Sequence, residues 1–260
     1  MSAAFERLPF GRVLAGGEPR FCLFDGESVR LLDRPAFEDG ALEQAEAAFA
    51  DVRLLAPVLP SKVVAVGLNY RAHADELAMQ VQAEPIIFLK PATTVVGPHE
   101  PIVAPARSAQ VDYEAELALV VGRRCRAVGP GSAADFVAGY TCGNDVTARD
   151  LQKLDGQWTR AKSFDTFCPL GPWVVREAPA AGAAVTAALD GVVVQRGEVG
   201  DMIVSPLDLL SFVSDVMTLE PGDVLMTGTP PGVGPLSPGQ VVTVEVEGVG
   251  RLSNPVTSGG

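Results

Sequence analysis

The chain reads DYEAELALVVG from Asp112 to Gly122, and the rest of the sequence is organised around this stretch. Its aliphatic and β-branched residues, closed by a glycine, predict a β-strand. Side chains two positions apart on a strand share a face, so Glu114 and Glu116 should project side by side. The opposite face should enter the core through Leu117, Leu119 and Val121.

Two neighbouring carboxylates on so apolar a strand repel each other and lose hydration, and a compensating charge would offset that cost. A divalent cation with oxygen ligands is one solution, and a solvent-facing acidic strand edge is the alternative. Asp145 follows a Gly-Asn turn at the end of another predicted strand. Such turns are often only solvated, but Asp145 would complete a three-carboxylate set with Glu114 and Glu116. That set suits Mg²⁺ or Mn²⁺.

Composition limits the classes of partner. With 260 residues, 47% of them hydrophobic, the chain can form one large domain or a small domain and a larger one. The net charge of −12 argues against nucleic acid or an anionic membrane as a partner. No signal peptide or membrane-spanning run is evident, so we expect a soluble, cytoplasmic protein. The widely spaced cysteines indicate reduced thiols, at Cys22, Cys125, Cys142 and Cys168.

The first 57 residues suggest a small α+β lobe. Strand-like segments at 11–15, 20–24 and 28–32 precede a helix-favouring run at 41–50. Pro57 and Pro60 then make a plausible boundary. We therefore predict a small N-terminal α+β domain over residues 1–58 and a larger catalytic domain over 59–260.

The larger region is predicted to be rich in strands. Strand patterns occur at 61–67, 85–90, 140–142, 172–175, 184–189, 192–195, 223–227, 240–247 and 251–255. Ser132 is a candidate N-cap for a short helix at 133–138. Asn69 lies where the N-cap of another helix would be, and Ser205-Pro206 should open a helix at 207–217. There is no regular strand–helix alternation, which argues for a strand-dominated α+β fold over a doubly wound one.

Several further residues could carry chemistry. His73 and Glu76 lie three residues apart, so on a helix they would share a face as a possible general-base pair; a partly buried structural histidine is the alternative. Lys162 lies among aromatic residues and could bind a carboxylate or stabilise an enolate, or could be a surface lysine. The glycine-rich run at 227–234 could cradle a carboxylate with its N–H groups or could be an ordinary turn. Without a following helix it does not match a phosphate loop or a nucleotide-binding module.

An ordered series of motifs resembles the fumarylacetoacetate hydrolase family. The series covers residues 60–256 and consists of GLNYxxHAxE (67–76), FLKP (88–91), DYExEL (112–117), GNDVTARDLQ (143–152), KSFDTFCPLGP (162–172) and TGTPxGVG (227–234). The resemblance implies a mixed β-roll or barrel-like catalytic domain, preceded by a small α+β domain and assembled as a homodimer.

The resemblance also implies roles for individual residues. Glu114, Glu116 and Asp145 match the family's ligands for Mg²⁺ or Mn²⁺. His73 and Glu76 match a catalytic pair on a short helix that orders as a lid closes over the substrate. The remaining matches line the oxo-acid end of the substrate, namely Lys162 with a catalytic role, and Arg149, Gln152 and Thr229.

The implied activity is metal-dependent chemistry on a 2-oxo or β-dicarbonyl acid through an enolate held by the metal. The motif wording favours a 2-hydroxyhepta-2,4-diene-1,7-dioate isomerase or a 5-carboxymethyl-2-oxo-hex-3-ene-1,7-dioate decarboxylase of aromatic catabolism. An acylpyruvate or fumarylpyruvate hydrolase and an oxaloacetate decarboxylase are alternatives. From another class, the same carboxylates could form a structural metal site in a non-catalytic protein.

Overall fold

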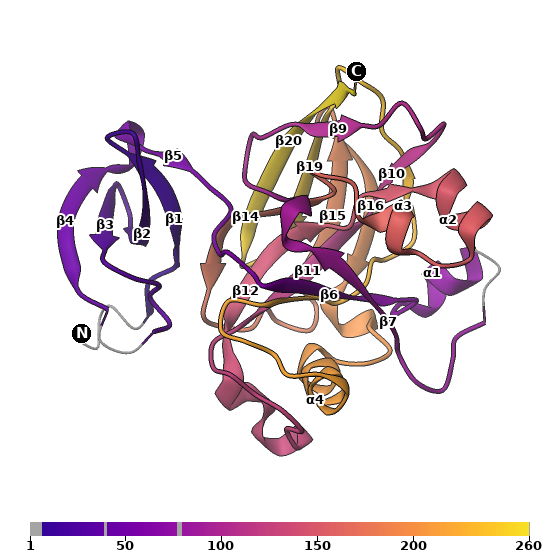
Figure 1. The fold of residues 1–260 in the computed structure, drawn as a ribbon, viewed down its shortest axis with the longest axis horizontal. Coiled ribbons are helices and arrows are strands. Elements are labelled where there is room, and N and C mark those ends of the chain that lie inside the picture. The colour runs from indigo at the N-terminus through magenta and orange to yellow at the C-terminus, as the bar shows by residue number, and fades with distance from the viewer. Residues whose placement is uncertain (1–6, 39–40, 77–79, 260) are drawn as a thin grey trace.

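The computed structural model describes residues 7–38, 41–76 and 80–259 (Figure 1). At the N-terminus an antiparallel lobe stands apart from the main body. Its strands are β1 (Phe10–Ala15), β2 (Glu18–Asp25), β3 (Ser28–Leu32) and β4 (Glu43–Ala48). The 3₁₀ turn Phe49–Asp51 and the short β5 (Arg53–Leu54), which pairs with β1, then lead into the main body.

The helix expected at 41–50 is wrong, because this segment contains strand β4. Alanine and glutamate favour a helix, but helix propensity is readily overridden by tertiary contacts. Only Leu42 and Phe49 are large apolar side chains in this run, so a helix would have little to bury. As a strand it pairs with β3 and satisfies the backbone groups of that strand. The boundary at residue 58 stays a prediction.

Three sheets form within the described residues, and the largest runs from the lobe into the main body through the pairing of β1 with β14. The largest has twelve strands, and beyond β1 its order continues through β14 (Cys168–Val175), β12 (Val137–Asn144), β11 (Ala115–Val121), β17 (Val224–Met226), β6 (Lys62–Gly67) and β7 (Ile86–Pro91), with β8 (Val95–Val96) beside β14. The second sheet contains β13 (Thr147–Ala148), β10 (Val111–Tyr113) and β18 (Gly234–Pro235). The third contains β16 (Val192–Glu198), β15 (Ala184–Leu189), β19 (Val241–Val246), β20 (Gly250–Ser258) and β9 (Ile102–Ala104).

The strand-dominated prediction is confirmed, but the sheets do not close into a barrel, because each strand order has two free ends. Most neighbours are antiparallel, whereas the pairs β6–β17, β8–β14 and β9–β20 are parallel. The sheets are therefore mixed, as the resemblance implies.

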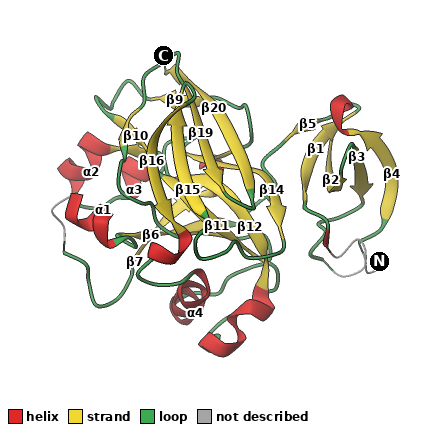
Figure 2. Cartoon of the chain, turned by 180° about the vertical axis from the view of Figure 1, so that it is seen from behind, coloured by secondary structure: helices red, strands yellow, loops and turns green. Residues whose placement is uncertain are grey.

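Short helices surround the sheets. They are α1 (Arg71–Glu76), α2 (Arg149–Asp155), α3 (Thr159–Lys162) and α4 (Pro206–Val216), and both ribbon views show α1, α2 and α3 on the side of the body away from the N-terminal lobe (Figure 2). Helix α4 begins as predicted, with the Ser205 hydroxyl accepting the Asp208 N–H at 3.2 Å. The short helix expected at 133–138 is a 3₁₀ helix over Pro130–Phe136 with Gly129, not Ser132, at its N-cap, and β12 begins at Val137. Further 3₁₀ turns cover Ala92–Thr94 and Val199–Asp201.

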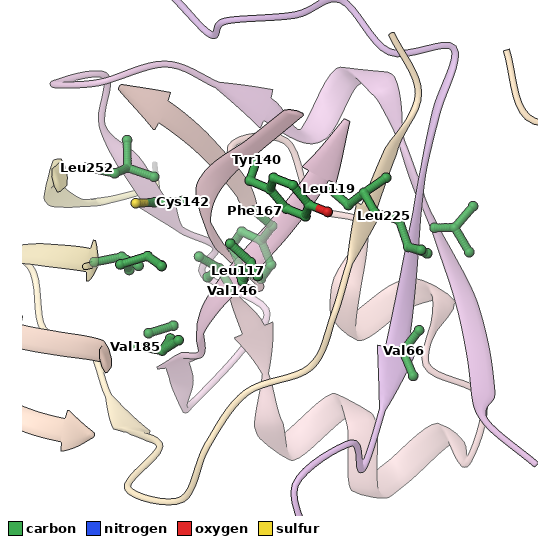
Figure 3. Close-up of a cluster of buried hydrophobic side chains, with 14 of the residues drawn as sticks. Val66, Leu117, Leu119, Tyr140, Cys142, Val146, Phe167, Val185, Leu225 and Leu252 are labelled. Atoms are coloured by element: carbon green, nitrogen blue, oxygen red, sulfur yellow. The ribbon is translucent and has the colours of Figure 1, made fainter. Parts of the chain in front are cut away.

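The stretch at 112–122 is two strands rather than one. The chain leaves the small sheet after β10 and enters the large sheet at β11, so the ladder breaks at Glu114. At the break, the Glu114 N–H donates to Asn144 Oδ1 at 3.0 Å. Both faces of β11 are buried. Leu117 and Leu119 lie in the cluster shown in Figure 3, whereas Ala118 and Val120 pack in a second cluster on the other side of the strand.

The described residues include no helix that is long and apolar enough to cross a membrane. The four cysteines are buried and free, in agreement with reduced thiols. Burial raises the pKa of Cys22, Cys142 and Cys168 to about 12, so these thiols are protonated at neutral pH.

Candidate active site

Three buried carboxylates converge where β10 meets β11 and where β12 ends. Glu114, Glu116 and Asp145 each offer an oxygen, and these oxygens lie within 4.8 Å of one another. The Asp145 N–H donates to the Glu114 carbonyl at 2.9 Å, which holds the two chain segments together. The predicted carboxylate set is thus assembled, and the alternative of a solvent-facing acidic edge is excluded by its burial.

Buried cations surround these carboxylates. Lys162 Nζ donates to Glu114 Oε2 at 2.9 Å and to Asp145 Oδ2 at 2.6 Å. Arg149 donates to Glu114 Oε1 at 2.6 Å and to Asp112 Oδ2 at 2.8 Å. Burial alone would lower the pKa of Lys162, but attraction to Asp145 and Glu114 outweighs it and raises that pKa. Lys162 is therefore a buried ammonium group beside the carboxylates rather than a surface lysine.

Sequence reasoning missed Lys90. This residue is fully buried on β7, and its ammonium group donates to Asp145 Oδ1 and, at 3.2 Å, to the Val146 carbonyl. Its position at the end of a strand pattern, within the FLKP motif, was the sequence feature that could have indicated a role in the site. Its partner lies 55 residues away, so the pairing itself could not be read from spacing.

Charge counting tests whether a divalent cation fits. Four buried carboxylates, the three above and Asp112, face three buried cations, namely Lys90, Arg149 and Lys162. Glu116 is the carboxylate without a cation partner among the described residues. Its burial and then its proximity to Asp145 and Glu114 raise its pKa well above the usual value. Burial also opposes ionisation of Glu114, but Lys162 and Arg149 outweigh this and lower the pKa of Glu114. An all-oxygen donor set with surplus negative charge suits Mg²⁺ or Mn²⁺.

The glycine-rich run at 227–234 holds carboxylates with its backbone, but they belong to the protein. The Gly228 N–H donates to Glu116 Oε2 at 2.7 Å, and the Gly232 N–H donates to Glu76 at 3.0 Å. Gly228 has φ +95°, and a Cβ there would lie 2.7 Å from Asn69 Cβ, so this position requires glycine.

Asn69 is not the helix N-cap that the sequence suggested. Its side chain donates to the carbonyls of Val204 and Thr227, at 2.9 and 2.8 Å, and accepts the Val204 N–H at 2.9 Å. It therefore ties the chain after β6 to the start of the glycine-rich run.

His73 and Glu76 lie on α1 as expected, with His73 Nδ1 3.1 Å from Glu76 Oε2. The His73 side chain is 5% exposed and lines the same cavity as the three carboxylates. A carboxylate that accepts from Nδ1–H leaves Nε2 as the basic nitrogen. Nε2 makes no hydrogen bond within the described chain, so it is available to a bound molecule.

The residues expected at the oxo-acid end also lie at the cavity. Arg149 donates to Gln152 Oε1 at 2.7 Å. The Thr229 hydroxyl donates to the Ala115 carbonyl at 2.8 Å and accepts from Gln195 Nε2 at 2.7 Å. Gln195, from β16, is a buried residue that sequence reasoning missed, because a polar residue in an edge-strand pattern gives no signal of burial.

The cavity at these residues has a volume of about 30 Å³. Besides eight of the nine predicted site residues, it is lined by Val66, Gly67, Leu68, Phe88 and Trp158; Glu76 supports His73 from outside the lining. Three carboxylates, an oriented histidine, an ammonium group and a guanidinium therefore surround one small space. Such an arrangement can bind a small oxo acid and move a proton on it.

Comparison with known proteins agrees with this picture. The family model described as fumarylacetoacetate (FAA) hydrolase C-terminal matches residues 62–257, and a model described as Rv2993c-like, N-terminal matches residues 10–57. The chain belongs to the fumarylacetoacetate hydrolase family.

Relatives and solved structures carry more specific names. Protein Rv2993c of Mycobacterium tuberculosis is 45% identical over 265 residues, covering 96% of this chain and 98% of the relative. Oxaloacetate tautomerase fahd2, mitochondrial, of Xenopus laevis is 42% identical over 220 residues, covering 80% of this chain and 69% of the relative. The structure of 2-hydroxyhepta-2,4-diene-1,7-dioate isomerase from Mycobacterium marinum superposes with a TM-score of 0.90 at 43% identity, covering 97% of this chain and 99% of that one.

Proposed function

We propose that this protein is a divalent-metal-dependent isomerase or tautomerase that moves a proton at the carbon next to the carbonyl of a 2-oxo dicarboxylic acid. The observation that carries the proposal is the shared cavity of His73 and the three carboxylates, with His73 Nδ1 held by Glu76. A base with one nitrogen anchored and the other free is suited to proton transfer.

The names of similar proteins support the same reaction class. One is called an isomerase and another an oxaloacetate tautomerase. Both names describe relocation of a proton and a double bond without cleavage of a carbon–carbon bond. We therefore favour proton transfer over hydrolytic cleavage or decarboxylation, and within it a 2-hydroxyhepta-2,4-diene-1,7-dioate isomerase or an oxaloacetate tautomerase.

Glu114, Glu116 and Asp145 would hold Mg²⁺ or Mn²⁺. When bound, the ion would polarise the substrate carbonyl as a Lewis acid. His73 Nε2 takes the proton from the adjacent carbon and returns it to the other end of the enol system. Glu76 keeps the imidazole in the required tautomer, and the Gly232 N–H holds Glu76 in turn.

The remaining groups position the acid. Lys162 uses two N–H bonds on Glu114 and Asp145, which leaves a third for an oxygen that gains negative charge. Gln152 accepts from Arg149 through its Oε1, so its amide NH₂ group is free to donate to a substrate carboxylate. Thr229 donates its hydroxyl proton to Ala115, so we expect it to shape the cavity rather than donate to the substrate.

An NMR experiment tests the proposal. The protein is incubated in D₂O with oxaloacetate or with a 2-hydroxymuconate-type dienoate, with Mg²⁺ or with EDTA. We expect Mg²⁺-dependent deuterium incorporation next to the carbonyl, or a shifted double bond, faster than in a His73→Gln variant. Release of CO₂ or of a cleaved acid pair without exchange would instead identify a decarboxylase or a hydrolase. Metal binding without any turnover would favour a structural site.

The family resemblance also leads us to propose a homodimer. Its molar mass in solution, measured by light scattering after size-exclusion chromatography, tests this directly. A monomer at all concentrations would contradict it.

A further inference from the structure

One side of the cavity is aromatic. Trp158 and Phe88 pack edge to face, with ring centroids 5.3 Å apart and planes at 77°. Both residues line the cavity together with the three carboxylates. None of the predicted roles uses either ring.

This aromatic wall is fixed to the catalytic machinery. The Lys162 N–H donates to the Trp158 carbonyl at 3.0 Å, so the two residues lie one helical turn apart at α3. The Lys162 ammonium group also lies 5.1 Å from the centroid of the Phe88 ring. The wall therefore stands at a fixed position relative to the cation that contacts Glu114 and Asp145.

Gly67 makes room for the Trp158 ring. A Cβ on Gly67, at the end of β6, would lie 2.5 and 2.7 Å from two ring carbons of Trp158. Gly67 does not have a positive φ, so its backbone conformation would accept other residues. Glycine is needed here because the indole lies directly against the strand.

The wall offers a substrate no charge. The cations lining the cavity, Lys162 and Arg149, are already paired with buried carboxylates. A second carboxylate pressed against the rings would lose hydration without gaining a partner, so we expect the rings to contact the carbon chain of the substrate rather than its second carboxylate. A chain of carbons can reach the rings but cannot extend through them.

From this arrangement we propose that Trp158 limits the chain length of the 2-oxo acid that the site accepts. The inference rests on the proposed function, because it concerns the substrate of that same site. Trp158 acts here as a specificity-determining residue, and Gly67 sets the position of its ring.

Two substitutions should move this limit in opposite directions. Trp158→Leu removes part of the wall and deepens the cavity, whereas Gly67→Ala pushes the indole into the cavity. Trp158→Phe keeps an aromatic wall with a smaller ring. Leu154→Ala, at a residue on α2 that is 75% exposed, serves as the matched control.

The experiment measures binding of straight-chain 2-oxo acids, from pyruvate to 2-oxohexanoate, by calorimetry in the presence of Mg²⁺. For the wild type we expect affinity to fall beyond a given chain length. Trp158→Leu should raise affinity for the first excluded acid by roughly tenfold, the usual discrimination of an apolar pocket against an extra methylene. It should leave pyruvate nearly unchanged. Gly67→Ala should shift the limit to a shorter acid, and Trp158→Phe should give an intermediate result.

The proposal is overturned if the variants change the affinity for all acids by the same factor. It is also overturned if the wild type binds acids of every length equally well, or binds none of them. Circular dichroism and thermal melting identify a misfolded variant. If one variant is misfolded, the remaining substitutions test the chain-length limit. Because binding is measured without turnover, a chain-length limit in a protein that exchanges no proton would support this inference while contradicting the proposed function.

Discussion

Gln195 Nε2 donates to the Thr229 hydroxyl at 2.7 Å, and Oε1 of the same amide accepts the Ala115 N–H at 3.0 Å. One buried side chain from β16 therefore connects the glycine-rich run to the backbone between Glu114 and Glu116. Gln195 Nε2 also donates to the Pro230 carbonyl at 2.7 Å, so both ends of the amide are occupied.

We expect Gln195→Leu to destabilise the protein and to weaken metal binding. The substitution leaves the Ala115 N–H buried without a partner, at a cost of about 1–3 kcal/mol. It also frees the segment that spaces two proposed metal ligands. Thermal melting and a Mg²⁺ titration measure the two effects, with Gln44→Leu on the exposed strand β4 as control. Unchanged Mg²⁺ affinity would restrict Gln195 to a purely structural role.

Glu116→Gln should act in opposite directions with and without metal. It removes the carboxylate that lacks a cation partner in the described site, so repulsion falls and the metal-free protein should melt at a higher temperature. The amide oxygen can still accept from Gly228. Mg²⁺ should then stabilise the variant far less than the wild type, which gains about 2.7 kcal/mol at a Mg²⁺ concentration 100 times the Kd. Calorimetric melting in Mg²⁺ and in EDTA measures both effects, with Glu177→Gln as the control. An equal rise in melting temperature on adding Mg²⁺ to the wild type and to Glu116→Gln would contradict the ligand assignment.

His73→Gln should lower the rate of proton exchange by ~10²–10⁴-fold, the usual contribution of a general base. Mg²⁺ affinity should stay close to the wild-type value, because the three carboxylates remain. The control is His99→Asn, at an exposed position with φ +65° that asparagine accepts. Exchange at the wild-type rate in His73→Gln would make this histidine structural.

Asp223 should make stability depend on pH below about pH 4. It accepts hydrogen bonds from Ser61, from Lys62 and, at 2.8 Å, from the Glu220 N–H. Burial alone would raise the pKa of Asp223, but these donors outweigh it and lower that pKa. The stabilisation is therefore present above the pKa of the unfolded chain, about 3.9, and is lost as pH falls through the lower folded value.

Urea unfolding at about pH 6, 4 and 3 measures this dependence. Asp223→Asn should be less stable than the wild type at pH 6, and the gap should narrow at pH 3. Asp165→Asn, at an exposed carboxylate, should show no such convergence. A gap that is constant across the three pH values would show that Asp223 acts through packing alone.

The sequence predicted most of the candidate site because its residues lie in short motifs with local geometry. Glu114 and Glu116 are two apart on extended chain, and His73 and Glu76 are one turn apart on a helix, so each pair could be inferred from spacing. That Asp145 should join the glutamates required the donor chemistry and the family resemblance, because pairing of β11 with β12 brings it there.

The site residues that the sequence could not predict are those whose hydrogen-bond partners lie far away along the chain. Lys90 and Gln195 gain their roles from residues 55 and 34 positions away, so their pairing could not be predicted from local spacing. The helix expected at 41–50 is wrong for a related reason: the free edge of β3 outweighs local helix propensity. In this chain strand pairing determines both the positions of these buried side chains and the conformation of residues 41–50.

The glycine-rich run holds Glu116 through Gly228 and Glu76 through Gly232, four residues further along. One loop therefore carries both a proposed cation ligand and the partner of the proposed base. Substitutions in this loop should be pleiotropic, altering ion affinity and proton transfer together. Substitutions of the Trp158 ring should instead change which acid is bound, because Gly228 and Gly232, and not this ring, hold Glu116 and Glu76.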